Sequence, residues 1–214
     1  GPCGRSNRSV APRPAGGVGD HHADGAPGAR EHLLAQAAGG GDVSSFDLLS
    51  STTLTSTPSS FTFSGLAAYA ADYKHLQVRL VPKSNYSANT DGLQLRFNGS
   101  TSTYYARKLF TNHGGTIQSE DQTSSYMNFG SSIPGTVSSQ NILGANIMDI
   151  YDFGNASKQT TVRHLNGFTT TAQGNVGISQ GMTSFNAAIT DISFKPWNGT
   201  AFEYGSRFTI YGVR

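Results

Sequence analysis

The stretch that decides the fold is Gly205-Ser-Arg-Phe-Thr-Ile-Tyr-Gly-Val-Arg214. Phe208 and Ile210 fall on one face of an extended chain, and Thr209 and Tyr211 fall on the other. This period of two predicts a β-strand with Phe208 and Ile210 in a core. Because a strand must pair its backbone groups, we expect this one to join an antiparallel sheet.

The same alternation recurs throughout residues 43–214. A hairpin is predicted around Pro58, and residues 112–140 are predicted to form a polar, partly stranded excursion. Further strands are expected at 76–80, 93–97, 104–110, 145–153, 160–168, 175–179, 188–194 and 202–213. About nine or ten short strands separated by turn signals indicate an all-β domain. The prediction is an antiparallel β-sandwich of the jelly-roll type.

Residues 1–42 differ in composition from residues 43–214. Gly, Ala, Pro, Arg and His dominate the segment, and it contains no aromatic residue. Such a segment cannot bury enough apolar surface to offset its ordering entropy, which predicts a flexible N-terminal arm. Two interpretations stay open. The arm is either disordered or non-native, or it becomes ordered against a neighbouring subunit.

Composition and charge exclude several classes of function. The net charge is only +2, and Lys and Arg are not clustered as in a nucleic-acid footprint. No apolar run approaches the roughly 20 residues that span a bilayer, so we expect no membrane insertion. Residues 1–15 lack the apolar core of a signal peptide. The single cysteine, Cys3, excludes an internal disulfide framework and a multi-cysteine zinc site.

Motifs for catalysis are mostly missing from the sequence. It contains no HExxH or GxxxxGK[ST] motif. Asp149 and Asp152 are three residues apart on a predicted strand, so they point to opposite faces and do not flank one bond. The pair Glu120-Asp121 is predicted to lie in a solvated loop, because two carboxylates are too few for a calcium site.

The histidines give no better candidate for catalysis or metal binding. Asp20-His21-His22 and Asp24 fall in the predicted arm, where nothing positions them as ligands. His75, His113 and His164 have no Ser or Cys partner at a recognisable spacing, and we interpret them as hydrogen-bonded sheet or loop residues. We therefore expect no enzyme activity, no metal and no cofactor.

Exposed aromatic side chains are the best candidates for a binding site. Trp197 lies in a turn after a predicted strand, where it either packs over the end of the sandwich or stacks on a sugar ring. Tyr86, Tyr104 and Tyr105 are candidates to complete such a glycan platform.

Three segments in order carry a family resemblance. They are Leu95–Gly99 with Tyr104-Tyr105, then Met148–Asn155 with Lys158–Arg163, then Ala188–Phe194 with Gly205–Gly212. Over about residues 48–214 the chain resembles small tail- or capsid-associated structural proteins of tailed bacteriophages.

This resemblance implies a β-sandwich component of the virion, assembled in the host cytoplasm and exposed on the particle. It implies a homo-oligomer, with a trimer suspected, that contacts other virion proteins and carries no catalytic residues. The expected role is a tail-associated or fibre module or a capsid decoration protein. The alternative is a carbohydrate-binding module that recognises a glycan of the host surface; a glycan-cleaving enzyme is a weaker third hypothesis.

Overall fold

The structure, a computed structural model, describes residues 45–111, 115–136, 142–170 and 174–214. The chain divides into two units, Gly1–Val43 and Ser44–Arg214. The predicted arm, with Cys3, Asp20-His21-His22 and Asp24, lies outside the described residues, as does His113.

The described residues form twelve strands and one short 3-10 helix, Leu66–Tyr69. The strands are β1 (Phe46–Thr53), β2 (Phe61–Phe63), β3 (His75–Val81), β4 (Thr90–Phe97), β5 (Tyr104–Thr111), β6 (Ile117–Ser124), β7 (Met127–Pro134), β8 (Ala145–Tyr151), β9 (Gln159–Thr169), β10 (Gly174–Asn186), β11 (Ile192–Pro196) and β12 (Arg207–Val213). All their pairings are antiparallel.

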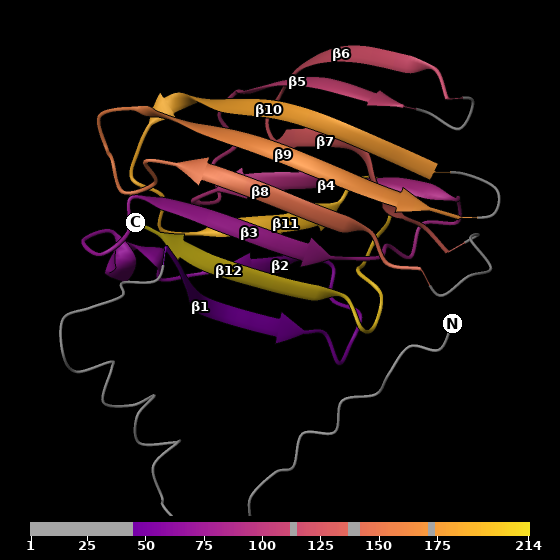
Figure 1. Cartoon of the computed structure of the whole chain (residues 1–214), viewed down its shortest axis with the longest axis horizontal. Coiled ribbons are helices and arrows are strands. Elements are labelled where there is room, and N and C mark those ends of the chain that lie inside the picture. The colour runs from indigo at the N-terminus through magenta and orange to yellow at the C-terminus, as the bar shows by residue number, and fades with distance from the viewer. Residues whose placement is uncertain (1–44, 112–114, 137–141, 171–173) are drawn as a thin grey trace, which may run out of the picture. The chain divides into compact units, whose positions relative to one another are not determined.

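Two sheets pack face to face, and they have jelly-roll topology. One sheet has the strand order β1-β12-β3-β8-β9-β10-β5-β6, and the other has the order β2-β11-β4-β7. Strands β1, β12, β3 and β8 face the four strands of the smaller sheet, and the first four strands of the chain, β1 to β4, alternate between the two sheets (Figure 1). The predicted antiparallel β-sandwich is confirmed.

The jelly roll consists of eight strands, four from each sheet: β1, β12, β3 and β8 from the larger sheet and β2, β11, β4 and β7 from the smaller one. Two hairpins add four more strands to the larger sheet. Strands β9 and β10 add next to β8, and strands β5 and β6 continue the sheet to a new edge (Figure 1). We call these four strands the extension. Its inner face lies over β7, which contacts β5, β9 and β10.

The core between the sheets consists of the alternating apolar residues that the sequence predicts. Phe208 and Ile210 of β12 are 0% and 1% exposed. The Phe208 ring stacks on Phe61, with 4.2 Å between ring centroids, and meets Phe202 edge to face at 5.0 Å. Because Phe61 belongs to the smaller sheet and Phe208 to the larger, this aromatic cluster joins the two layers.

The inner face of the extension is polar instead. His164 is fully buried and its Nε2 lies 2.9 Å from Oδ1 of Asn146. Lys108 is buried too, and its Nζ reaches Oε2 of Glu120 at 3.0 Å. Burial lowers the pKa of His164 to about 3, so its imidazole is neutral in the folded protein.

Two expectations about local structure are wrong. The segments around Pro58 do not form a hairpin, because β1 pairs with β12 and β2 pairs with β11 in the other sheet. The excursion at 112–140 does contain strands as predicted, namely β6 and β7. Glu120 and Asp121 lie in β6 rather than in a loop, where they pair with Lys108 and Arg107.

Candidate functional site

The outer face of the eight-stranded sheet carries a row of exposed apolar side chains. The pairings Ile147↔Leu165, Leu165↔Ile178 and Ile178↔Leu109 place one residue from each of β8, β9, β10 and β5 side by side. Their exposed fractions are 40%, 52%, 50% and 49% in that order. Val176 and Ile117 lie further along β10 and β6 and are 55% and 69% exposed. Monomeric proteins rarely expose such a contiguous apolar set.

A row of charged and amide side chains lies directly beside the apolar row. Strand pairing puts Asp149, Arg163, Gln180, Arg107 and Asp121 next to one another across β8, β9, β10, β5 and β6. Nη2 of Arg163 donates to Oδ2 of Asp149 at 2.7 Å, and Nε of Arg107 lies 3.6 Å from Oδ1 of Asp121. The charges therefore run acid, base, amide, base, acid across the sheet.

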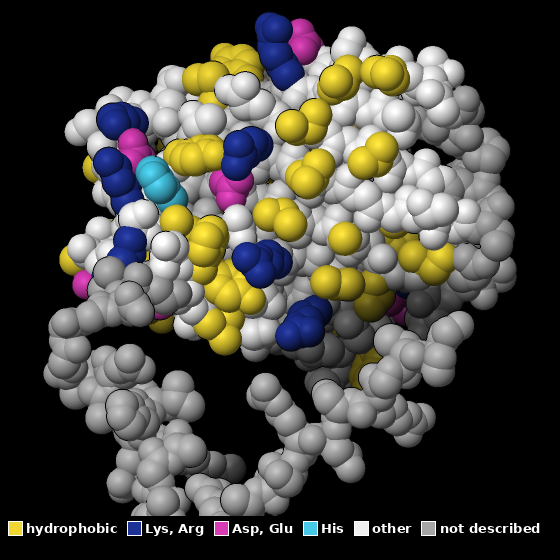
Figure 2. Space-filling model, viewed as in Figure 1, with side chains coloured by type: hydrophobic (Ala, Val, Ile, Leu, Met, Phe, Trp, Pro, Cys, Tyr) yellow, Lys and Arg dark blue, Asp and Glu magenta, His cyan; other side chains and the backbone are white. Residues whose placement is uncertain are grey.

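Part of both rows lines an open hollow of about 810 Å³. Its lining includes Leu109 and Ile178 of the apolar row and Arg107, Arg163, Gln180 and Asp121 of the charged row, together with Tyr151 and Thr161. A second, almost wholly apolar hollow of about 380 Å³ continues between Leu109, Ile117 and Val176. Figure 2 shows hydrophobic side chains gathered across this face beside a few basic and acidic ones. We call this region, over strands β8, β9, β10, β5 and β6, the sheet face.

Trp197 lies elsewhere, in a loop that a buried carboxylate holds in place. Oδ1 of Asp91 accepts hydrogen bonds from the backbone N–H of Gly92 and Asn198, and from Nδ2 of Asn198. Oδ2 of Asp91 accepts from Oγ of Ser84 at 2.6 Å and from the N–H of Gly199 at 2.9 Å. Asp91 is 2% exposed, and its carboxylate satisfies three buried donors, from Ser84, Gly92 and Gly199, and two part-buried donors of Asn198. It thereby joins the loop of Ser84 to the loop of Trp197.

The loop held by Asp91 presents Trp197 at the surface. The indole is 43% exposed and packs over Gly92, where an added Cβ would lie 2.8 Å from Cε3 of Trp197. Tyr86 belongs to the neighbouring loop, and its backbone N–H donates to Oγ of Ser84 at 2.9 Å. Part of the Trp197 ring therefore packs against the protein, and part of it is exposed to solvent. The two predicted roles, packing and contact with a ligand, are compatible in this geometry.

The structure does not bring the four predicted aromatic residues together. Tyr104 is 1% exposed, and its hydroxyl bonds the backbone of Phe97, so its predicted role in glycan binding is wrong. Tyr105, the next residue of β5, points outward on the sheet face and is 44% exposed. Adjacent residues of one strand point to opposite faces, so Tyr104 and Tyr105 cannot belong to one platform.

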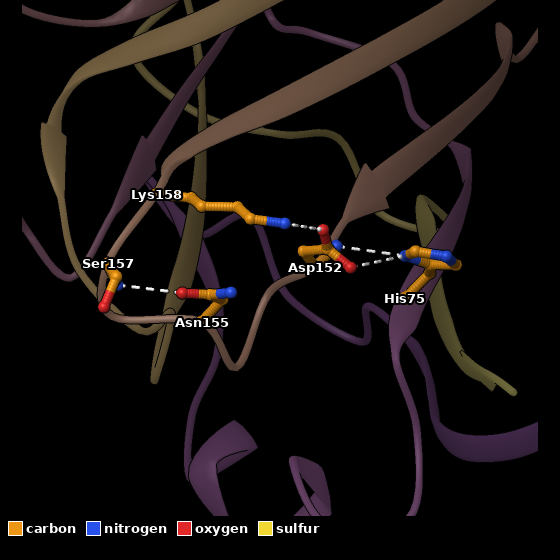
Figure 3. A network of polar contacts seen from close by, with 5 residues as sticks. All are labelled: His75, Asp152, Asn155, Ser157 and Lys158. Carbon is orange, nitrogen blue, oxygen red and sulfur yellow. Dashed lines mark hydrogen bonds and ion pairs between the residues drawn. The ribbon is translucent and has the colours of Figure 1, made fainter.

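A third polar cluster surrounds the turn after β8 (Figure 3). Nζ of Lys158 donates to Oδ2 of Asp152 at 2.9 Å, and this hydrogen bond holds the pKa of Asp152 below its ordinary value. The backbone N–H of Asp152 donates to Nδ1 of His75 at 3.0 Å. Nδ1 of His75 also lies 3.9 Å from Oδ1 of Asp152, so the ring contacts both the backbone and the carboxylate of this residue.

The geometry of this cluster is that of a stabilised turn. Asp152 has a φ of 50°, in the left-handed region, and the contacts to Lys158 and His75 hold it there. Asn155 accepts from the N–H of Ser157 at 2.9 Å and closes the next turn (Figure 3).

No cluster of three or more His, Cys, Asp or Glu residues that could hold a metal ion occurs in the described ranges. Among the same residues no helix has the length and apolar character needed to cross a membrane. Asp149 lies on the sheet face and Asp152 in the turn beyond it, and each carboxylate is paired with a cation.

The sheet face was missed by the sequence reasoning, although a signal for it is present. In β10 the apolar residues Val176 and Ile178 alternate with Asn175, Gly177 and Ser179. Alternation marks a strand with two unlike faces, but it does not say which of them is buried. In this strand the small and polar residues face inward and the apolar residues face outward.

Comparison of the chain with protein-family models, with curated proteins and with solved structures finds no match. The candidate surfaces therefore rest on the residues of this chain alone.

Proposed function

We propose that the protein is a non-enzymatic structural protein of a bacteriophage particle, either a tail-associated or fibre module or a capsid decoration protein. In this role it assembles with copies of itself and with other virion proteins. The observation that supports assembly is the sheet face, where four paired strands expose Ile147, Leu165, Ile178 and Leu109 in one row. Such a face is costly in water and favours a protein partner.

The described residues offer rigid surfaces for assembly. Antiparallel pairing fixes the sheet face along its whole width, and the core beneath the jelly-roll strands is closely packed. Rigid elements position contact residues without a further entropy cost on binding.

Two measurements test the proposal. Sedimentation velocity from about 1 to 100 μM should show an oligomer, and a monomer throughout that range would contradict self-assembly. The position of the gene tests the virion role, because a structural protein of a phage should be encoded beside capsid or tail genes.

A carbohydrate-binding function is the second candidate, and the exposed Trp197 favours it. An aromatic ring on a rigid loop is suited to stack on a sugar face, and three hydrogen bonds from Asn198 and Gly199 to Asp91 hold this loop. A glycan array should then give hits with the wild type that Trp197→Ala removes and Tyr105→Ala retains. An array without hits would exclude the proposed glycan contact.

A further inference from the structure

We infer that the sheet face binds the same face of a second copy of this chain, about a two-fold axis that runs parallel to the strands between β9 and β10. The inference rests on the self-assembly proposed above and adds its symmetry and its contacts. The argument comes from the order of side chains across the sheet.

A two-fold axis in this position exchanges the strands in pairs. Strand β9 of one copy faces β10 of the other, β8 faces β5, and β3 faces β6. The apolar row then meets itself, because Leu165 faces Ile178 and Ile147 faces Leu109. Strands lie about 4.8 Å apart, so all four residues fall within roughly 7 Å of the axis. Packed sheets cross at an angle near 30°, but residues this close to the axis shift only slightly from the positions opposite their partners in the second copy.

The charged row becomes complementary about the same axis. Asp149 faces Arg107 of the second copy, and Arg163 faces Gln180. Gln77, which pairs with Asp149 in β3, faces Asp121. Each contact occurs twice, as an isologous interface requires.

Neighbouring positions of the axis match the two rows less well. An axis over β10 would place Arg163 opposite Arg107 and Asp149 opposite Asp121, so these contacts would be between like charges. An axis between β10 and β5 keeps Arg163 opposite Asp121 but places Leu165 opposite Ser119, and an axis between β8 and β9 keeps Asp149 opposite Arg163 but places Ile178 opposite Arg79. An axis perpendicular to the strands at the charged row would place each residue opposite its own copy, again joining like charges. The charge order and the apolar row together therefore select a second copy as the occupant and the axis between β9 and β10.

The side chains in these contacts are available for a partner. The Arg107 side chain is 82% exposed, and that of Asp121 is 71% exposed. The Asp149 side chain is 20% exposed and accepts from Nε and Nη2 of Arg163 and from Nε2 of Gln77. A guanidinium of the second copy would add a donor from a third residue.

The test uses two charge reversals in the full chain, Arg107→Glu and Asp149→Arg. Each variant alone places like charges at both copies of the contact, and we expect its dimer dissociation constant to rise at least tenfold. An equimolar mixture should recover dimerisation, because Asp149 of the first variant meets Arg107 of the second and Glu meets Arg at the other contact. Sedimentation velocity measures both states, and Lys195→Glu on the smaller sheet is the matched control.

A further variant covers the case in which Asp149→Arg unfolds the chain. Ile178→Glu places a carboxylate opposite Leu165 beside the axis, and its own side chain is half exposed in the monomer. It should abolish the dimer and leave the circular dichroism spectrum unchanged.

The outcomes separate this inference from the proposed function. A wild-type monomer would refute self-assembly itself. A trimer, or an oligomer that resists Arg107→Glu and Ile178→Glu, would overturn only the two-fold sheet face. Variants that weaken the dimer singly but do not recover as a mixture would show that the axis is misplaced. A monomer whose sheet face resists hydroxyl-radical labelling would show that another segment of the chain covers it.

Discussion

Replacement of Asp91 tests the account of the Trp197 loop most directly. The carboxylate accepts five hydrogen bonds, from Ser84, Gly92, Asn198 (twice) and Gly199, over 2.6 to 3.2 Å. Asp91→Ala removes the acceptor and leaves these donors in a buried site. Each buried donor left without its acceptor costs about 1–3 kcal/mol, so the three buried donors of Ser84, Gly92 and Gly199 should together cost about 3–5 kcal/mol after relaxation of the loop. For a domain of this size the melting temperature should fall by roughly 6–20 °C.

Asp91→Asn tests the two carboxylate oxygens separately, because it keeps one acceptor oxygen and replaces the other by an NH₂ group. The amide keeps an acceptor for Gly92 and Asn198, but it places an NH₂ group against the N–H of Gly199. Ser84 can rotate its hydroxyl to accept from the amide. We therefore expect about half of the loss caused by Asp91→Ala, or about 2 kcal/mol.

Urea unfolding monitored by circular dichroism measures both variants. The single tryptophan, Trp197, reports the loop independently, and its emission in folded Asp91→Ala should shift to longer wavelength. Lys195→Ala is the control, because its side chain is exposed on the smaller sheet and its replacement should change stability by less than about 0.5 kcal/mol. A stability for Asp91→Ala within 1 kcal/mol of the wild type would refute the reasoning.

Three further predictions concern the core and the extension. Phe208→Ala removes a ring that is 0% exposed and stacked on Phe61, so chemical denaturation should show a loss of about 3–5 kcal/mol. Glu120→Ala should destabilise by about 1–3 kcal/mol because it strips the carboxylate from the buried ammonium of Lys108, whereas Lys108→Met should stay within about 1 kcal/mol of the wild type; equal losses in urea would contradict this. Because burial holds the pKa of His164 at about 3, its contribution is complete above about pH 6.5 and declines as the pH falls towards 3, by up to about 1.4 kcal/mol per pH unit. Urea titrations at several pH values should give a shallower decline for His164→Gln, and identical slopes would refute the role of this residue.

The core strands were predictable because alternation and burial coincide in them. Leu76, Val78 and Leu80 face inward as expected, and so do Phe208 and Ile210. The failed hairpin around Pro58 has a different cause. A jelly roll pairs strands that lie far apart in the sequence, so local turn signals do not identify the partner.

The candidate binding residues were harder to predict, because exposure depends on the whole fold. Trp197 is exposed only because Asp91, over 100 residues away in the sequence, fixes its loop. The error over Tyr104 and Tyr105 could have been avoided from the sequence. Both lie in one predicted strand, and adjacent strand residues point to opposite faces, so they cannot share a platform. The sheet face needed both the pairing order and the direction of each strand.

In the extension, the pattern of buried and exposed residues is the reverse of that in the jelly-roll strands, and this reversal points to function. In the jelly-roll strands the apolar face is buried, as the hydrophobic effect requires. In β5, β9 and β10 the polarity is reversed, so that Lys108, His164 and Asn166 are buried while Leu109, Leu165 and Ile178 lie in water. Both parts of this reversal are unfavourable for an isolated chain, because buried polar groups must all be bonded and exposed apolar ones gain nothing. A partner that covers the outer face would bury these apolar side chains, so that polarity and burial would agree there. We therefore expect the partner on the four strands of the extension.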